Sequence, residues 1–309
     1  MEEEHNETSC FIQKTTANNL LITVYFVTFF GGTTGIALMI FLITGANRLS
    51  VTITSVINLL VVHGIFIVGV PFRIVYYFQN KWPYGLFFCR VVSAMSHIHI
   101  YISFIFYVVL LTMRYVGFFK QKDSIAFYRT LHPFLVSGIV WFLVCVIILP
   151  LVFTQYGTSA PLNEKDCFQF QTEFKNRAVL IMNYIFITVI ILVVSLLLAV
   201  QIFIIVNVLK KIQRPILAHQ EIWVQLKSLF FILVMITCFF PFHIFRIYYM
   251  QHPKECFYYN EICLSITALS CLDFFFFAVA RFYKKSICCF TCISNDFEVS
   301  MINVSCISH

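Results

Sequence analysis

The stretch FCRVVSAMSHIHIYISFIFYVVLLTMRYVGFF, residues 88–119, decides the fold of this chain. It is almost entirely apolar and longer than the roughly 20 residues that an α-helix needs to cross the hydrocarbon core of a bilayer. Cys89 and Arg114 are 25 residues apart, which corresponds to about 37 Å of helix at roughly 1.5 Å per residue. These two residues therefore lie near opposite faces of a membrane.

Other parts of the chain have the same apolar character. Hydrophobic residues make up 60% of the chain and charged residues only 11%, whereas soluble proteins carry about 25% charged residues. In lipid a helix is favoured, because it satisfies every backbone polar group within its own segment. The sequence predicts an all-α membrane protein, a seven-transmembrane helix bundle. Its expected spans are 20–44, 52–78, 88–119, 130–154, 177–209, 225–250 and 259–283.

The polar segments predict three regions and an orientation. They are an extracellular N-terminal tail (1–19), the bundle (20–283) and a cytoplasmic tail (284–309). With the N-terminus outside, 12 of the 21 Lys and Arg residues lie on the cytosolic side, as the positive-inside rule favours. Asn6 begins an Asn-Glu-Thr glycosylation sequon in the outer tail. We expect a multi-pass plasma-membrane protein in contact with the lipid bilayer, with no cleavable signal peptide.

The segment after the last span combines basic, aromatic and cysteine residues. Arg281-Phe282-Tyr283-Lys284-Lys285 is followed by Cys288, Cys289 and Cys292. This pattern predicts a short amphipathic cytoplasmic helix on the inner leaflet, with lipidation of Cys288 and Cys289. A zinc site is the alternative, but no fourth ligand lies nearby in the sequence.

Several motifs resemble those of class A (rhodopsin-like) G-protein-coupled receptors over nearly the whole chain. They are Asn58-Leu59 in the second span, Arg114-Tyr115 at the inner end of the third, Trp141 and Pro150 in the fourth, Cys238-Phe239-Phe240-Pro241 in the sixth and Leu272-Asp273 in the seventh. The resemblance implies a cell-surface receptor, orphan-like, that signals to a heterotrimeric G protein. Departures fall in the same motifs. Met113 replaces the acidic residue that the family has before Arg114, and Phe239 replaces its tryptophan. Phe274 and Phe277 replace its proline and tyrosine.

The resemblance assigns a switching role to the inner half of the bundle. An arginine at the depth of Arg114 needs a partner, and Glu221 reaches the same cytoplasmic face from the sixth span. We expect an Arg114–Glu221 ion pair that holds the inactive state, with Tyr115 beside it. The alternative is that Arg114 extends to the lipid headgroups. Pro241 should kink the sixth span and so allow two helix arrangements.

His63 occupies the position where many relatives have a sodium-binding aspartate. A sodium ion prefers oxygen ligands, so no sodium site is expected. His63 is instead placed to bond Asp273 on the seventh span, which would make the bundle sensitive to pH; the alternative is a neutral core histidine. His97 and His99 are two residues apart and face different ways, which argues against a metal pair. No cofactor and no metal is predicted.

Two disulfide bonds are expected at the outer face. The family resemblance implies that Cys89, at the start of the third span, bonds to Cys167 in the long loop after the fourth. Cys10 in the N-terminal tail is predicted to bond to Cys256 or Cys263, and connectivity of this kind does not follow from sequence alone.

The outer half of the sixth span carries a candidate ligand site. His243 and Arg246 share one helix face and look like the His-x-x-Arg element of purinergic nucleotide receptors and their lipid-sensing relatives. The predicted ligand-binding residues are Arg73, His97, Tyr101, His243 and Arg246. Arginine suits carboxylate or phosphate, so an anionic nucleotide-like or lipid-like extracellular ligand is expected. The alternatives are a peptide or another kind of ligand, or arginines that reach the headgroups and bind no ligand.

Other classes of function lack their motifs. No metalloprotease or hydrolase motif is present, so no enzyme is predicted. No nucleic-acid binding is expected, because no soluble surface interleaves basic and aromatic residues. A membrane transporter is an alternative, but the chain has no internal repeat and only 10 glycines. A non-signalling seven-helix scaffold is the other alternative. No lysine lies between Lys254 and Lys284 to form an opsin Schiff base.

Overall fold

The computed structural model describes residues 10, 12–44, 51–119, 132–143, 146, 167–168, 177–211, 220–252 and 255–279. Within these ranges the chain forms helices and no strands. Asn6, the predicted cytoplasmic helix and Cys288 and Cys289 lie outside the described residues. Glu221 lies within a described helix, but its side chain is not described.

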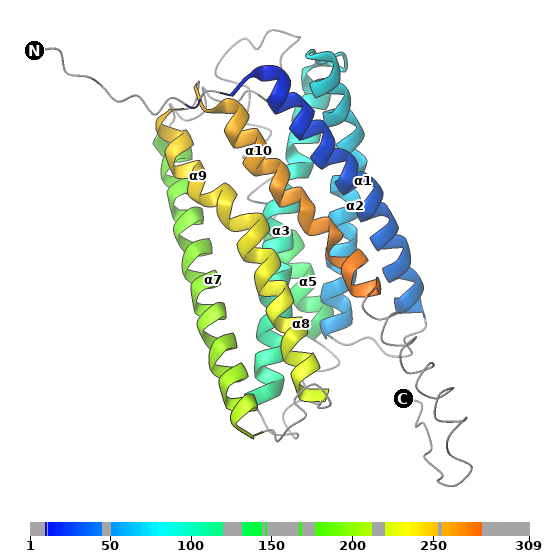
Figure 1. Cartoon of the computed structure of the whole chain (residues 1–309), viewed down its shortest axis with the longest axis vertical. Helices are drawn as coiled ribbons and strands as arrows, with labels where there is room; N and C mark the ends of the chain where they lie inside the picture. Colours follow the sequence, from blue (N-terminus) through cyan, green and yellow to red (C-terminus); the bar gives the residue numbers. More distant parts are fainter. Residues whose placement is uncertain are drawn as a thin grey trace, which may run out of the picture.

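The helices run side by side along the long axis of the molecule (Figure 1). The first five are α1 (Lys14–Thr44), α2 (Val51–Gln79), α3 (Gly85–Phe119), α5 (His132–Leu143) and α7 (Arg177–Lys211). The sixth helix comprises α8 (Gln220–Val234), η5 (Met235–Phe239) and α9 (Phe240–Gln251). The seventh comprises α10 (Phe257–Ala268), η6 (Leu269–Leu272) and helical residues 273–279. Each of the seven predicted spans contains a helix, which confirms the predicted all-α bundle.

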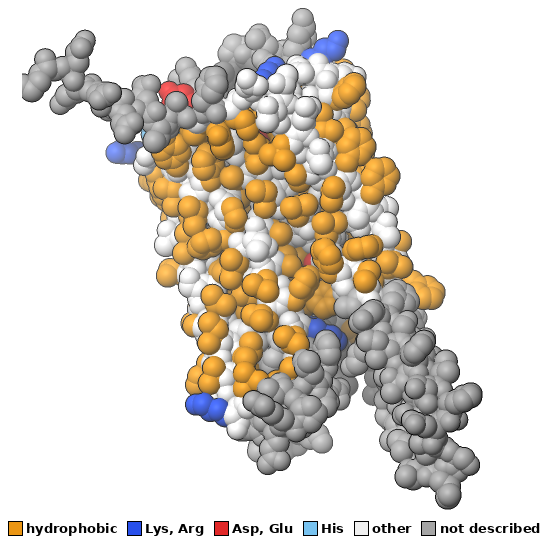
Figure 2. All heavy atoms as spheres, viewed as in Figure 1, with side chains coloured by type: hydrophobic (Ala, Val, Ile, Leu, Met, Phe, Trp, Pro, Cys, Tyr) orange, Lys and Arg blue, Asp and Glu red, His pale blue; other side chains and the backbone are white. Residues whose placement is uncertain are grey.

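The outside of the bundle is suited to lipid. Apolar side chains cover the face shown in Figure 2, and the coloured Lys and Arg side chains lie mainly toward its two ends. Phe41, Phe78 and Leu196 are each at least 65% exposed. Six helices in the described part of the chain are long and apolar enough to cross a membrane. Of the fourth predicted span, α5 is described and most of the remainder is not.

Glycines let α1 approach the seventh helix closely. A Cβ atom on Gly35 would lie 2.7 Å from the backbone nitrogen of Phe275, and one on Gly32 would lie 3.2 Å from the Cβ of Cys271. Small residues spaced in this way are typical of membrane helices whose backbones pack closely. The position of α1 against the seventh helix therefore depends on Gly32 and Gly35.

The sixth helix is irregular next to its proline. Pro241 cannot donate a backbone hydrogen bond, and its ring clashes with the carbonyl of the residue four positions earlier, which is Thr237. The π-helical segment η5 spans Met235–Phe239 and is centred on that residue. The predicted kink thus takes the form of a π-helical turn, a common way for a helix to accommodate such a break.

Candidate ligand site

Two disulfide bonds link chain segments at one end of the bundle. Cys89, near the start of α3, is bonded to Cys167, as predicted. Cys10 is bonded to Cys256, which immediately precedes α10, and Cys263 is a free cysteine. The first bond places Phe168, the neighbour of Cys167, against the guanidinium of Arg73, with 4.2 Å between the Arg73 Cζ atom and the ring centroid.

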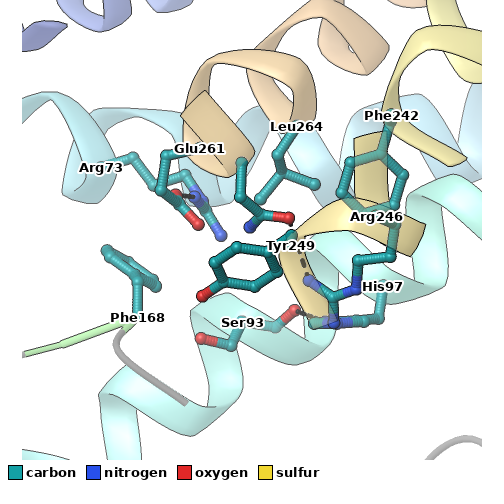
Figure 3. Close-up of a pocket in the computed structure, with 10 residues that line it drawn as sticks. Arg73, Ser93, His97, Phe168, Phe242, Arg246, Tyr249, Glu261 and Leu264 are labelled. Carbon is teal, nitrogen blue, oxygen red and sulfur yellow. Dashed lines mark hydrogen bonds and ion pairs between the residues drawn. The ribbon is translucent and has the colours of Figure 1, made fainter. Parts of the chain in front are cut away.

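A pocket opens at this end, between α2, α3, α9 and α10 (Figure 3). The empty space between its lining side chains is about 440 Å³ when the part open to solvent is counted, and about 40 Å³ of it admits a water-sized sphere. The lining combines two arginines, one carboxylate, small polar groups and large apolar side chains. The lining residues are Arg73, Ser93, His97, Phe168, Phe242, Arg246, Tyr249, Asn260, Glu261 and Leu264.

On one wall, Arg73 is engaged in a buried ion pair. Its Nη1 atom donates to Glu261 Oε2 and to the hydroxyl of Tyr25, each at 3.2 Å. The hydroxyl of Tyr77 donates to the same Glu261 oxygen at 2.5 Å. The Arg73 and Glu261 side chains are 3% and 4% exposed. Glu261 therefore balances the charge of Arg73, and this network connects α1, α2 and α10.

Arg246 provides the second positive charge of the pocket. Its Nη1 atom donates to the side-chain carbonyl of Asn260 at 3.1 Å. The guanidinium lies 5.4 Å from the ring centroid of Tyr249 and 5.7 Å from that of Phe242. His97, which lies close to Arg246 in Figure 3, hydrogen bonds through Nδ1 to the backbone carbonyl of Ser93 at 2.8 Å.

The remaining two predicted ligand residues do not line the pocket. Tyr101 on α3 packs against Phe186 of α7, with ring centroids 5.3 Å apart. His243 is buried beside Phe242, and its Nε2 atom has no hydrogen-bond partner. The pocket thus brings together Arg73, His97 and Arg246. No role for Glu261 follows from the sequence, because nothing in the sequence indicates that Glu261 faces Arg73.

The C-terminal end of α3 contacts the fifth and sixth helices. Arg114 donates from Nη1 to the hydroxyl of Ser228 at 3.2 Å, and its Cζ atom lies 5.2 Å from the ring centroid of Phe231. The hydroxyl of Tyr115 donates to the backbone carbonyl of Leu197 on α7 at 3.2 Å. The Arg114–Glu221 ion pair involves an undescribed side chain and stays a prediction.

In the middle of the bundle, Asp273 accepts a hydrogen bond from the hydroxyl of Tyr107 at 2.7 Å. His63 Nε2 lies 3.7 Å from the other Asp273 oxygen, which is too long for a hydrogen bond. His63 Nδ1 instead lies 3.2 Å from Nε2 of His99. His99 does face away from His97, as predicted, but nothing in the sequence indicates that His99 meets His63.

Comparison with known proteins decides the class of the chain. The family model described as 7 transmembrane receptor (rhodopsin family) matches residues 34–291. The chain belongs to the rhodopsin family of seven-transmembrane receptors. The receptor is 45% identical over 276 residues to Probable G-protein coupled receptor 141 of Homo sapiens, covering 86% of this chain and 90% of the human protein.

More distant relatives lie in the same family. Probable G-protein coupled receptor 34 of Mus musculus is 27% identical to the receptor over 300 residues, covering 92% of this chain and 80% of that protein. Cysteinyl leukotriene receptor 2 of Mus musculus is 29% identical over 246 residues, covering 72% of each chain. N-arachidonyl glycine receptor of Macaca fascicularis is 26% identical over 213 residues, covering 67% of this chain and 63% of that protein.

The predicted class of function is therefore confirmed. The receptor is a multi-pass plasma-membrane protein of a family that signals through G proteins, and that family consists of receptors, not enzymes. Membership in it favours a receptor over the transporter alternative.

Proposed function

We propose that the receptor responds to a lipid-like amphiphile that carries a single negative charge, bound in the pocket between α2, α3, α9 and α10. The observation that carries this proposal is the charge balance of the lining. Two arginines and one glutamate, with histidine counted as neutral, give a formal charge of +1. Because Glu261 balances Arg73, Arg246 supplies the net charge. One carboxylate or one phosphodiester matches it.

The apolar part of the lining supports an amphiphile over a nucleotide. Phe168, Phe242 and Leu264 offer apolar surface for a hydrocarbon chain in the same pocket as Arg246. A nucleotide with several phosphate charges would place uncompensated charge beside the Glu261 carboxylate, and like charges in a buried site repel strongly. Two of the distant relatives are named for cysteinyl leukotrienes and for N-arachidonyl glycine.

The pocket faces the outside of the cell in this proposal, so that the N-terminus is extracellular. Support comes from the disulfides Cys10–Cys256 and Cys89–Cys167, which lie at the pocket end of the bundle. Disulfide bonds persist in oxidising compartments and are rare in the cytosol. Arg114, at the other end of α3, then lies at the cytoplasmic face, where a G protein binds.

The sixth helix connects the two ends. Arg246 on α9 and Ser228 on α8 belong to the same helix, with the irregular segment η5 between them. A ligand that binds Arg246 better in one arrangement of this helix favours that arrangement, and the contact of Ser228 with Arg114 changes with it. The ligand shifts the equilibrium only by its difference in affinity for the two arrangements.

The test is a G-protein dissociation assay in cells, with parallel libraries of anionic lipids and nucleotides. Wild type is compared with Arg246→Gln, Arg246→Lys and, as a matched control, Arg90→Gln, at equal surface expression. Arg90 is an outer arginine that does not line the pocket. A hydrogen bond to a charged group contributes about 1.5–3 kcal/mol, so Arg246→Gln should lower lipid potency roughly 10- to 150-fold. Arg246→Lys should lower it less, and Arg90→Gln should leave it unchanged.

Three outcomes contradict the proposal. They are a nucleotide as the only agonist, a lipid agonist whose potency is the same in Arg246→Gln as in wild type, and an equal loss in Arg90→Gln. The last would indicate that the arginines act on the surrounding membrane instead of on a bound ligand.

A further inference from the structure

We propose that His63, His99 and Cys271 bind a zinc ion where α2, α3 and the seventh helix meet. This inference does not depend on the identity of the ligand in the outer pocket. The three residues come from distant parts of the chain, and their metal-binding atoms all lie within 4.8 Å of one another. It departs from the expectation that the chain has no metal site.

The spacing of the atoms suits a tetrahedral metal. Zinc is bound at about 2.0–2.1 Å by imidazole nitrogen and about 2.3 Å by thiolate sulfur. Two ligand atoms on a tetrahedral zinc are therefore roughly 3.3–3.6 Å apart. His63 Nδ1 lies 3.2 Å from His99 Nε2, and the Cys271 sulfur lies 3.4 Å from the same nitrogen. The third separation, between the ligand atoms of His63 and Cys271, is no more than 4.8 Å.

Asp273 is placed to orient His63 as a ligand. When a histidine binds a metal through one ring nitrogen, the other usually donates to a carboxylate, which fixes the tautomer. With His63 Nδ1 on the metal, its Nε2–H faces the Asp273 Oδ1 atom, 3.7 Å away. Both atoms are buried and have no hydrogen-bond partner. A bound metal would fix the tautomer that lets these two atoms pair.

Charge balance at this depth also favours a divalent cation. Cys271 as a thiolate and Asp273 as a carboxylate contribute two negative charges, which one Zn²⁺ neutralises. Both residues are at most 1% exposed, and an uncompensated charge is costly in such an environment. Nitrogen and sulfur ligands favour zinc over a hard cation such as sodium or calcium. The fourth ligand is water or the Ser270 hydroxyl, which lies 3.4 Å from His99 Nε2.

The experiment uses the purified full-length receptor in lipid nanodiscs, loaded with Zn²⁺ or with Co²⁺ as its spectroscopic substitute. X-ray absorption at the zinc edge should find one sulfur at about 2.3 Å and two nitrogens at about 2.0–2.1 Å. Co²⁺ should give the near-ultraviolet charge-transfer absorption of a cobalt–thiolate bond. Cys271→Ser should abolish that absorption, and Asp273→Asn should lower the metal affinity about 10- to 100-fold.

Two matched controls test whether other thiols bind the metal. Cys263→Ser removes a free cysteine outside the cluster, and a triple variant replaces Cys288, Cys289 and Cys292 with serine. Both should keep the absorption and the affinity of wild type. The proposal fails if wild type holds no stoichiometric zinc, or if the bound zinc has no sulfur neighbour, a result that requires no variant to fold. It also fails if Cys271→Ser binds cobalt as wild type does.

Discussion

The buried ion pair between Arg73 and Glu261 gives the sharpest prediction for stability. Glu261→Gln keeps an oxygen that accepts from Tyr77 but removes the negative charge that Arg73 faces at 3.2 Å. Arg73 then remains buried with its charge uncompensated. Arg73→Met removes the positive charge and leaves Glu261 buried instead. We expect both single variants to be strongly destabilised.

The magnitude follows from the distance and the burial. At 3.2 Å and an effective dielectric constant of about 20, the attraction of two unit charges is about 5 kcal/mol. Removal of one partner from a buried pair typically costs about 3–5 kcal/mol. A chain of this size loses about 2–4 °C of melting temperature per kcal/mol, so each single variant should melt about 6–20 °C lower. Replacement of both partners by apolar residues is often close to neutral.

The assay is the apparent melting temperature of the receptor in nanodiscs, measured at one fixed heating rate because membrane proteins commonly unfold irreversibly. The set is wild type, Arg73→Met, Glu261→Gln, Glu261→Leu and the double variant Arg73→Met/Glu261→Leu. The double variant should be more stable than either single variant at the same two positions.

Two results would refute this reasoning. If the single variants melt within about 2 °C of wild type, the pair is not isolated from solvent in the way that its 3% and 4% exposure indicates. If the loss in the double variant equals the sum of the two single losses, the residues are not coupled. In that second case Glu261 would not balance the charge of Arg73, and a single negative charge on the ligand would no longer follow.

Three further predictions concern other contacts. Gly35→Val should lower the melting temperature and surface expression, because a Cβ atom there meets backbone at 2.7 Å. Gly64→Ala has no atom within 4 Å of its Cβ and should be neutral or stabilising. Equal effects of the two variants would contradict the packing of α1 against the seventh helix. Mass spectrometry of a non-reducing digest should find a peptide that joins Cys10 to Cys256, and a Cys10 peptide that carries a free thiol would contradict the second disulfide. Ser228→Ala should change basal G-protein activity about 10-fold or more at matched surface expression, because one hydrogen bond to a charged group contributes about 1.5–3 kcal/mol, or roughly 10- to 150-fold in an equilibrium constant. Basal activity equal to wild type would exclude this contact from the switch.

The sequence predicted the helices well because the signal is local. Each span is an apolar run long enough to cross a bilayer, and lipid leaves the backbone almost no alternative to a helix. The helix ends are less well predicted. α1 begins at Lys14 instead of Leu20. In this additional stretch Asn18 donates to the side chain of Asn80 at 2.8 Å, a contact that no periodicity indicates.

Residues of the candidate sites were predicted mainly where a single residue is unusual for its position in the sequence. Arg73 and His63 stand out because a charged or polar side chain inside an apolar span requires an explanation. Their partners Glu261 and His99 are 188 and 36 positions away, and their pairing depends on how the helices are rotated against each other. Helix rotation is set by side-chain packing, which a single sequence does not reveal.

One departure from the family motifs lies in a packed aromatic group next to Arg114. Phe277, in place of a tyrosine, stacks on Phe231 with ring centroids 4.7 Å apart. Phe231 also contacts Tyr107, at 5.8 Å, and the guanidinium of Arg114, at 5.2 Å. Aromatic pairs of this kind contribute about 0.5–1.5 kcal/mol each beyond their burial. An outward movement of α8 would have to separate Phe231 from the third and the seventh helix together, so here aromatic packing restrains the movement of the sixth helix.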